Sequence, residues 1–113
     1  MSFNRDFAKK KAMKQGFVYL LSNKGRTLLY IGATKDLKVR ISLHKKGKGA
    51  QFTNKYKVHD LLYFEEFKEY KEAFIREKQL KNWRKEWKWN LIKTKNPELT
   101  SLNLDEIYKD TLS

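Results

Sequence analysis

Two side chains suited to chemistry lie on the apolar side of an expected helix. Residues 37–45 read LKVRISLHK, and at about 100° per residue Arg40 and His44 fall within the apolar arc of this stretch. That arc is formed by Leu37, Val39, Ile41 and Leu43. A charge and a titratable ring facing a core cost free energy unless they have a partner or a task. A guanidinium can hold a phosphate oxygen and an imidazole can accept a proton, so the pair suits phosphate-ester chemistry.

Three further side chains extend this pattern. Tyr19 and Tyr30 each lie in a β-rich stretch, and Glu77 lies on the apolar stripe of a second expected helix. Each residue also has an ordinary structural explanation. Tyrosines pack in strands, an arginine stem covers apolar surface, a histidine is satisfied inside a core, and Glu77 pairs with Lys81 one turn on. Both explanations stay open for each residue taken alone, whereas their joint presence favours chemistry.

Together these side chains fit the hydrolysis of a phosphodiester bond by water. The attacking water must lose a proton, the developing charge needs a fixed cation, and the leaving oxygen benefits from a metal ion. Arg40 would hold a phosphate oxygen, and Glu77 would bind one divalent cation, Mg²⁺ or Mn²⁺, with water and substrate as its other ligands. A phenol with a pKa of about 10 is a weak base at neutral pH, so Tyr19 would need His44 to accept its proton.

An expected hairpin positions the two tyrosines. Residues 16–22 and 27–33 are rich in β-formers and are separated by the polar segment NKGR. With the loop centred between Lys24 and Gly25, Tyr19 lies directly opposite Tyr30 and both phenols share one face of the sheet. Residues 58–67 are aromatic and aliphatic enough for a third strand that closes a small antiparallel sheet.

Helices and loops account for most of the remaining chain. Thr34 or Asp36 can cap the helix expected over residues 37–45, and the glycines of KKGKG end it. We expect a loop over residues 49–57 and a helix from 70 to about 83. A further helical segment follows and ends before Asn96 and Pro97.

The chain length indicates a single domain with two extensions. We expect a basic N-terminal extension over residues 1–15, a folded domain over 16–96, and a C-terminal tail or short helix over 97–113. With no cysteine there is no disulfide framework, thiolate metal site or cysteine nucleophile. No apolar run approaches the roughly 18 residues of a membrane span. We therefore expect a cytoplasmic protein with no membrane partner.

Net charge points to a polyanionic partner. The chain has 26 Lys and Arg against 13 Asp and Glu, a net charge of +13. A basic solubilising surface or a contact with an anionic membrane are the alternatives. The basic residues cluster in one stretch, which we interpret as a phosphate-binding track. Its candidate residues are Lys35, Lys38, Lys45, Lys46, Lys48, Lys55 and Lys57.

The pattern of motifs resembles the GIY-YIG nuclease superfamily. Its first motif corresponds to Phe17-Val18-Tyr19, with Phe17 in place of the first glycine, and its second to Tyr30-Ile31-Gly32. The run T-x-D-L-x-x-R-I-x-x-H follows from Thr34 to His44, and REKQLKNW places Glu77 at the position of the metal-binding glutamate. The likeness covers residues 16 to 92 and is nearest to a small stand-alone branch similar to the N-terminal nuclease domain of the excinuclease C subunit.

This resemblance implies an α/β (α+β) fold, with a small three-stranded antiparallel sheet flanked by helices, and a metal-dependent cut by water. Tyr19 would act as general base, and Tyr30 would position water or phosphate. Arg40, His44 and Glu77 would serve the transition state, the proton relay and the metal. Tyr56 stands where many relatives keep an active-site group, and we expect it to contact nucleic acid.

We therefore expect a DNA endonuclease, plausibly of repair or recombination, whose substrate could be branched or damaged DNA and whose targeting could need a protein partner. The alternative is a nucleic-acid binding module on the same scaffold that does not cleave by itself. No element for base-specific readout is visible in the sequence.

Overall fold

A three-stranded antiparallel sheet forms the centre of the molecule. The computed structural model describes residues 15–107, so the predicted basic extension lies outside the described residues except for Gln15. The strands are β1 (Gly16–Ser22), β2 (Leu29–Thr34) and β3 (Asp60–Phe67), in the spatial order β2-β1-β3. The predicted fold class, α/β (α+β) with a small antiparallel sheet, is confirmed, and β2 is left as a free edge.

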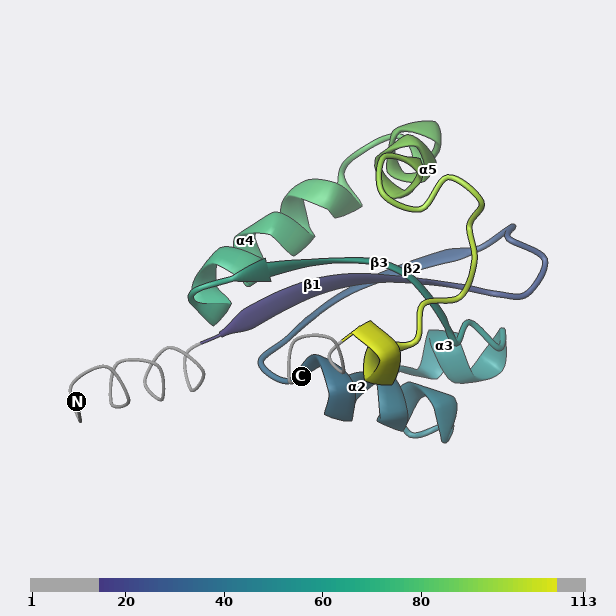
Figure 1. The fold of residues 1–113 in the computed structure, drawn as a ribbon, viewed down its shortest axis with the longest axis horizontal. Helices are drawn as coiled ribbons and strands as arrows, with labels where there is room; N and C mark the ends of the chain where they lie inside the picture. Colours follow the sequence, from purple (N-terminus) through teal and green to yellow (C-terminus); the bar gives the residue numbers. More distant parts are fainter. Residues whose placement is uncertain (1–14, 108–113) are drawn as a thin grey trace.

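Helices cover both faces of this sheet. They are α2 (Leu37–Lys45), α3 (Gln51–Lys55), α4 (Tyr70–Lys81) and α5 (Lys85–Lys93). Figure 1 shows α4 and α5 on one face and α2 and α3 on the other. The predicted loop over residues 49–57 is wrong, because it contains α3; a five-residue helix is too short for periodicity to reveal. Within residues 15–107, no helix has the length and apolar character to cross a membrane.

The alternation of side chains along β1 divides the core into two clusters. Phe17, Tyr19 and Leu21 pack with Leu37 and Ile41 of α2. Val18 and Leu20 point to the other face, where they pack against α4 and α5. All seven residues of β1 are buried, as expected of a central strand that is covered on both faces. Tyr19 therefore belongs to the face that carries α2.

The hairpin register differs by two residues from the prediction. Tyr19 pairs with Gly32, and Tyr30 pairs with Leu21. The loop is longer because Asn23 fastens it, its Oδ1 accepting from the backbone N–H groups of residues 27 and 28 at 2.9 and 3.0 Å. A shift of two residues keeps each side chain on its face. The two tyrosines are thus diagonal neighbours on one face, with ring centroids 6.3 Å apart.

Helix α2 buries a narrower stripe than the sequence suggested. Asp36 caps the helix, its Oδ1 accepting from the Val39 N–H at 3.2 Å. Val39 itself is 55% exposed, so its assignment to the apolar arc is wrong. Residues two apart on a helix are separated by about 200°, which places Val39 far from Ile41. The fully buried stripe is Leu37, Ile41 and His44, with Arg40 half-buried beside it.

The C-terminal segment returns to the α2 side of the sheet. The Leu102 N–H donates to the Leu61 carbonyl at 2.8 Å, and Leu104 is buried in the cluster that contains Tyr19. Residues 104–107 are helical (Figure 1). Asn96 ties this return in place, since its amide donates to the carbonyls of Leu62 and Thr100 at 2.9 and 2.8 Å. Residues 97–107 therefore complete the core.

Gly32 is required because the Tyr19 phenol lies across it. A Cβ at position 32 would overlap the phenol ring and its hydroxyl. We expect Gly32→Ala to displace the phenol and to lower the free energy of unfolding by about 1–3 kcal/mol. Urea unfolding measures this change. Gly25→Ala is the matched control, because its added Cβ would meet nothing closer than 3.9 Å. Equal stability of the two variants would contradict the expectation.

Candidate active site

The candidate site lies along β2, one of the two edge strands of the sheet. Tyr19 reaches from β1 across Gly32 to this edge, because Gly32 has no side chain on that face. The rings of Tyr19, Tyr30 and His44 form a compact group, with centroids 5.5 to 6.3 Å apart. Arg40 and His44 come from α2 on one face, whereas Glu77 comes from α4 on the other. The edge strand is where groups from both faces can meet.

A chain of hydrogen bonds orients the imidazole of His44. Thr53 donates its single hydroxyl proton to the Ala50 carbonyl at 2.9 Å. Its oxygen therefore accepts from His44 Nδ1, 2.8 Å away. This assignment leaves His44 Nε2 without a proton, so that it accepts from the Tyr19 hydroxyl at 3.0 Å. The network thus directs the phenol proton toward the imidazole.

Arg40 supplies the second partner of the phenol. Its Nε donates to Tyr19 Oη at 3.3 Å, and this hydrogen bond raises the pKa of Arg40 above its ordinary value. The Tyr19 hydroxyl consequently accepts a hydrogen bond from Arg40 and donates one to His44. A guanidinium carries five N–H groups, and the bond to Tyr19 uses only one of them. The remainder of the fork is suited to a phosphate oxygen.

Burial keeps both members of the Tyr19–His44 pair uncharged at neutral pH. It is the main cause that raises the pKa of Tyr19 to about 12, and the charges of Tyr30 and Glu77 add to the rise. Burial also lowers the pKa of His44 to about 4, with a further contribution from the Arg40 charge. The resting site therefore holds a protonated phenol and a neutral imidazole that can accept its proton.

Glu77 is a carboxylate whose charge acts on the Tyr19 phenol. Its side chain is only 15% exposed, and its charge reaches Tyr19 strongly enough to contribute to the raised phenol pKa. Lys81 Nζ lies 3.2 Å from Glu77 Oε2, so the ordinary i, i+4 ion pair that the sequence left open is formed. The Lys81 side chain is 53% exposed, and such a pair is weak in water.

A single carboxylate fits one hard cation whose other ligands are water and phosphate. Throughout residues 15–107, no group of three or more His, Cys, Asp or Glu side chains is arranged to hold a metal ion. A metal enclosed by protein ligands is therefore not the arrangement that these residues offer. Glu77, largely shielded from solvent and paired with an exposed lysine, suits an ion that binds together with the substrate.

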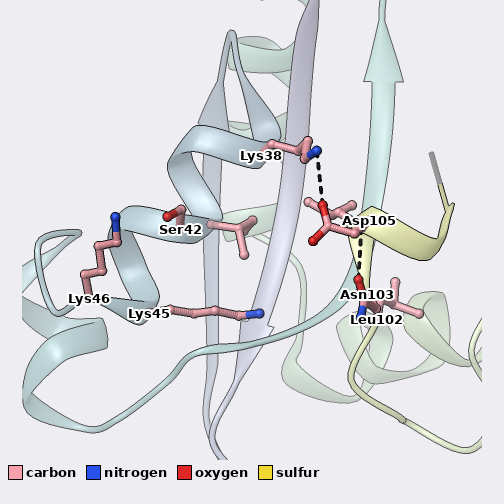
Figure 2. Close-up of a pocket in the computed structure, with 9 residues that line it drawn as sticks. Lys38, Ser42, Lys45, Lys46, Leu102, Asn103 and Asp105 are labelled. Atoms are coloured by element: carbon pink, nitrogen blue, oxygen red, sulfur yellow. Dashed lines mark hydrogen bonds and ion pairs between the residues drawn. The ribbon is translucent and has the colours of Figure 1, made fainter. Parts of the chain in front are cut away.

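The lysines of the predicted phosphate-binding track lie on different parts of the surface. All seven of its lysines are exposed. Lys38 and Lys45 lie on the flank of α2 away from Arg40, where they line a hollow of about 480 Å³ with the C-terminal segment. Figure 2 shows this hollow, in which Lys38 Nζ pairs with Asp105 at 3.1 Å. None of the candidate catalytic side chains lines it. The hollow is therefore separate from the candidate site.

The other predicted contacts lie elsewhere on the basic surface. Lys46 lines the same hollow as Lys38, and Lys35 stands over the ring of Tyr70, 5.7 Å from its centroid. Lys48 and Lys57 are exposed in the segments that flank α3. Lys55 and Tyr56 lie at the end of α3, close to the edge of the sheet that carries Tyr30. This last pair therefore lies beside the candidate site.

Two contributors to the site were not predicted from the sequence. Thr53 is completely buried and orients His44. Gly49 lies against the same ring, since a Cβ there would overlap the imidazole. Both fall in the stretch that was interpreted as a loop. A helical interpretation of residues 51–55 would have placed Thr53 on an inner face, but so short a helix leaves no periodic signal.

The neutral state of His44 makes stability depend on pH. The pKa of His44 falls from its ordinary 6.5 to about 4 on folding. Between these values the unfolded chain binds a proton that the folded chain does not, so this contribution is complete above pH 6.5 and is lost toward pH 4. We expect a loss of up to about 3 kcal/mol. Urea unfolding over this range, compared with His44→Gln, isolates the contribution; identical pH slopes would contradict it.

Comparisons with known proteins identify the family of this chain. Residues 15–96 match the family model described as the GIY-YIG catalytic domain. A UPF0213 protein of Staphylococcus aureus is 33% identical over 81 residues, which cover 72% of this chain and 98% of that protein. One from Staphylococcus haemolyticus is 34% identical over 80 residues, covering 71% and 96%.

The solution NMR structure of a UPF0213 protein from Bacillus halodurans is 30% identical and covers 74% of this chain and 88% of its own, with a TM-score of 0.49. The family match includes all three strands, the four helices and each candidate catalytic residue. The chain therefore belongs to the GIY-YIG catalytic domain family.

Proposed function

We propose that this protein is a metal-dependent endonuclease that hydrolyses phosphodiester bonds of DNA. Membership of a nuclease family supports hydrolysis of nucleic acid as the general activity. The observation that carries the proposal is the position of Tyr19 Oη, which is 3.3 Å from Arg40 Nε and 3.0 Å from His44 Nε2. A phenol that lies between the Arg40 guanidinium and an unprotonated imidazole nitrogen is suited to moving a proton beside a phosphate.

The proposed reaction moves two protons in one relay. As the water oxygen bonds to phosphorus, its proton passes to Tyr19 Oη, and the phenol proton passes to His44 Nε2. The phosphorus–oxygen bond to the leaving strand then breaks, the leaving oxygen takes a proton from solvent water, and His44 returns its extra proton to solvent by way of Tyr19. Thr53 keeps the Nδ1 proton in place, so the imidazole accepts only at Nε2. The relay avoids a free phenolate, which a pKa of about 12 would make rare at neutral pH.

Arg40 and Glu77 would stabilise the negative charge of the transition state. The Arg40 fork would donate to non-bridging phosphate oxygens, and Tyr30 would position the water or the phosphate. Glu77 would hold one Mg²⁺ or Mn²⁺ in place of the Lys81 ammonium, an ion that when bound supplies Lewis-acid stabilisation to the phosphate and the leaving oxygen. Each residue thus has one task in this scheme.

The charge of the chain supports a nucleic-acid substrate. The net charge of +13 favours a polyanion, and the exposed lysines around α2 and α3 provide phosphate contacts. We propose action in the cytoplasm on branched or damaged DNA, in repair or recombination, with a protein partner that selects the target. The nearer likeness to the nuclease domain of the excinuclease C subunit stays a prediction.

A binding module that cleaves only with a partner is the second candidate. The Glu77–Lys81 ion pair favours it, because the carboxylate is occupied at rest. In this case a partner or a bound substrate would have to release Glu77 before a cation could bind. Both candidates place nucleic acid at the same edge of the sheet.

Replacement of Glu77 separates the two candidates. We expect the wild-type protein to cleave labelled duplex, flap or branched DNA in Mg²⁺ or Mn²⁺, and Glu77→Gln to lose about a hundredfold or more in rate, because several kcal/mol of charge stabilisation are removed. Glu86→Gln, an exposed acid in the first turn of α5, is the matched control. Unchanged cleavage by Glu77→Gln would refute the metal role, whereas binding without cleavage by any variant would support the binding module.

Removal of the Thr53 hydroxyl tests the proton relay. Thr53→Val keeps the shape of the side chain but loses the hydrogen bond to His44 Nδ1, so both tautomers become accessible. We expect kcat to fall about tenfold or more with little change in KM, and ¹⁵N NMR of the imidazole to show mixed tautomers. Thr94→Val is the control, since its hydroxyl also donates to a backbone carbonyl, 2.6 Å away, at the end of α5. A pure Nδ1–H tautomer together with an unchanged kcat in Thr53→Val would contradict the role of Thr53 in holding the tautomer that the relay needs.

A further inference from the structure

A row of aromatic rings leads from the candidate site to the surface. Tyr30 contacts His44 and is stacked with Phe52, with centroids 6.2 Å apart and an interplanar angle of 22°. Phe52 in turn lies 5.0 Å from Tyr56. Exposure rises along the row, because Tyr30 is half-buried while Phe52 and Tyr56 are 38% and 46% exposed. The aromatic row, Tyr30–Phe52–Tyr56, therefore starts beside the reacting groups and ends in solvent.

Phe52 and Tyr56, the outer two rings of the row, are not packed in the core. Phe52 and Tyr56 expose large apolar faces that a packing role would bury, and contiguous apolar exposure on a soluble protein commonly marks a binding site. The packing of α3 nevertheless holds both rings in place. They are four residues apart across α3, and between them Thr53 is completely buried and bonded to His44 and Ala50. The helix that orients His44 thus also holds the rings ready.

The surroundings of the row are basic. A hollow of about 240 Å³ on one side of Phe52 is lined by Leu29, Tyr30, Ile31, Phe52, Lys81 and Lys88. A second hollow, of about 530 Å³, is lined by Gln51, Phe52, Asn54, Lys55 and Tyr56. Among residues 15–107, no carboxylate lines either hollow, and the Lys55 ammonium lies 5.3 Å from the Tyr56 ring centroid. Aromatic faces with lysines between them suit a negatively charged chain of planar groups.

The first of these hollows also connects the row to Glu77. Lys81, which pairs with Glu77 at 3.2 Å, lines it together with Tyr30 and Phe52. The hollow thus lies at the sheet edge between groups from α3 on one face and the end of α4 on the other. A phosphate placed beside Arg40 and Glu77 would have its neighbouring nucleotide within reach of Phe52.

We propose that the aromatic row is a stacking platform for unpaired DNA bases next to the scissile phosphate. Its ligand is single-stranded DNA, either free or as the unpaired part of a flap or branch. In continuous duplex both faces of a base are covered by its neighbours, so only an unpaired base can stack on Phe52. The statement that a cut occurs beside the platform rests on the proposed nuclease function; the stacking itself does not.

Binding without cleavage tests the platform. Fluorescence anisotropy at fixed salt in EDTA, with labelled oligothymidylate and with a blunt duplex, measures affinity while excluding hydrolysis. We expect Phe52→Leu, which keeps apolar bulk but removes the ring, to weaken single-strand binding about tenfold and to leave duplex binding within about twofold, since phosphate contacts dominate there. Phe52→Trp should bind the single strand at least as well as the wild type.

Phe74→Leu is the matched control. Phe74 is 41% exposed on α4 and has a lysine ammonium 4.8 Å from its ring centroid, but it is not part of the row. We expect this variant to bind both DNAs as the wild type does. Should Phe52→Leu prove unstable by thermal unfolding, Tyr56→Leu, at the exposed end of the row, gives the same comparison with an expected loss of about threefold or more.

The outcomes for stacking and for cleavage are distinct. Equal affinity of Phe52→Leu and wild type for the single strand, or equal weakening toward single strand and duplex, would overturn the platform even if the enzyme cuts DNA. Selective loss of single-strand binding would support it even if no variant cleaves. Cleavage that requires Glu77 but ignores both strandedness and Phe52 would support the nuclease and reject the platform.

Discussion

The hydrogen bonds of one buried phenol connect most features of the candidate site. Tyr19 begins in the central strand, lies across Gly32 and ends between Arg40 Nε and His44 Nε2. Burial makes the phenol difficult to ionise, and the same burial makes the imidazole difficult to protonate. Each group is a poor reagent alone, but together they form a path along which a proton can move without a stable charge on either.

The edge of the sheet explains why the participating residues come from both faces. A fully covered sheet separates the groups on its two faces, and only at a free edge can they approach each other. Strand β2 is that edge, with α2 on one side and α4 on the other (Figure 1). Gly32 opens the edge strand to the phenol, and the half-buried Glu77 approaches from the opposite helix. The architecture therefore offers a site between layers without a deep pocket.

Helix α3 links the chemistry to the surface. It is only five residues long and would be unstable in isolation, yet the buried hydroxyl of Thr53 ties it to His44. The same short helix carries Phe52 toward solvent and ends next to Tyr56. The same turn therefore contacts the imidazole on its buried side and presents the two rings on its exposed side. The hollow under the C-terminal segment also contains lysines, but it is lined by none of the candidate catalytic side chains (Figure 2).

The local sequence was sufficient to predict whether most segments form strands or helices. It also revealed which polar residues lie on apolar stripes. Strand alternation, the Asp36 cap and the glycines after α2 are interactions between near neighbours, so they predicted the sheet, the helix and its end. The presence of Arg40, His44 and Glu77 on apolar stripes was visible for the same reason.

Tertiary structure alone decided which neighbours those residues have. The register of β1 and β2 depends on how Asn23 folds the loop, and the exposure of Val39 depends on which flank of α2 meets the sheet. The role of Thr53 and the division of the lysines between two surfaces likewise require packing between segments that are distant in sequence. A side-chain pattern records which groups are costly to bury, whereas only the packed chain determines the partners that offset this cost.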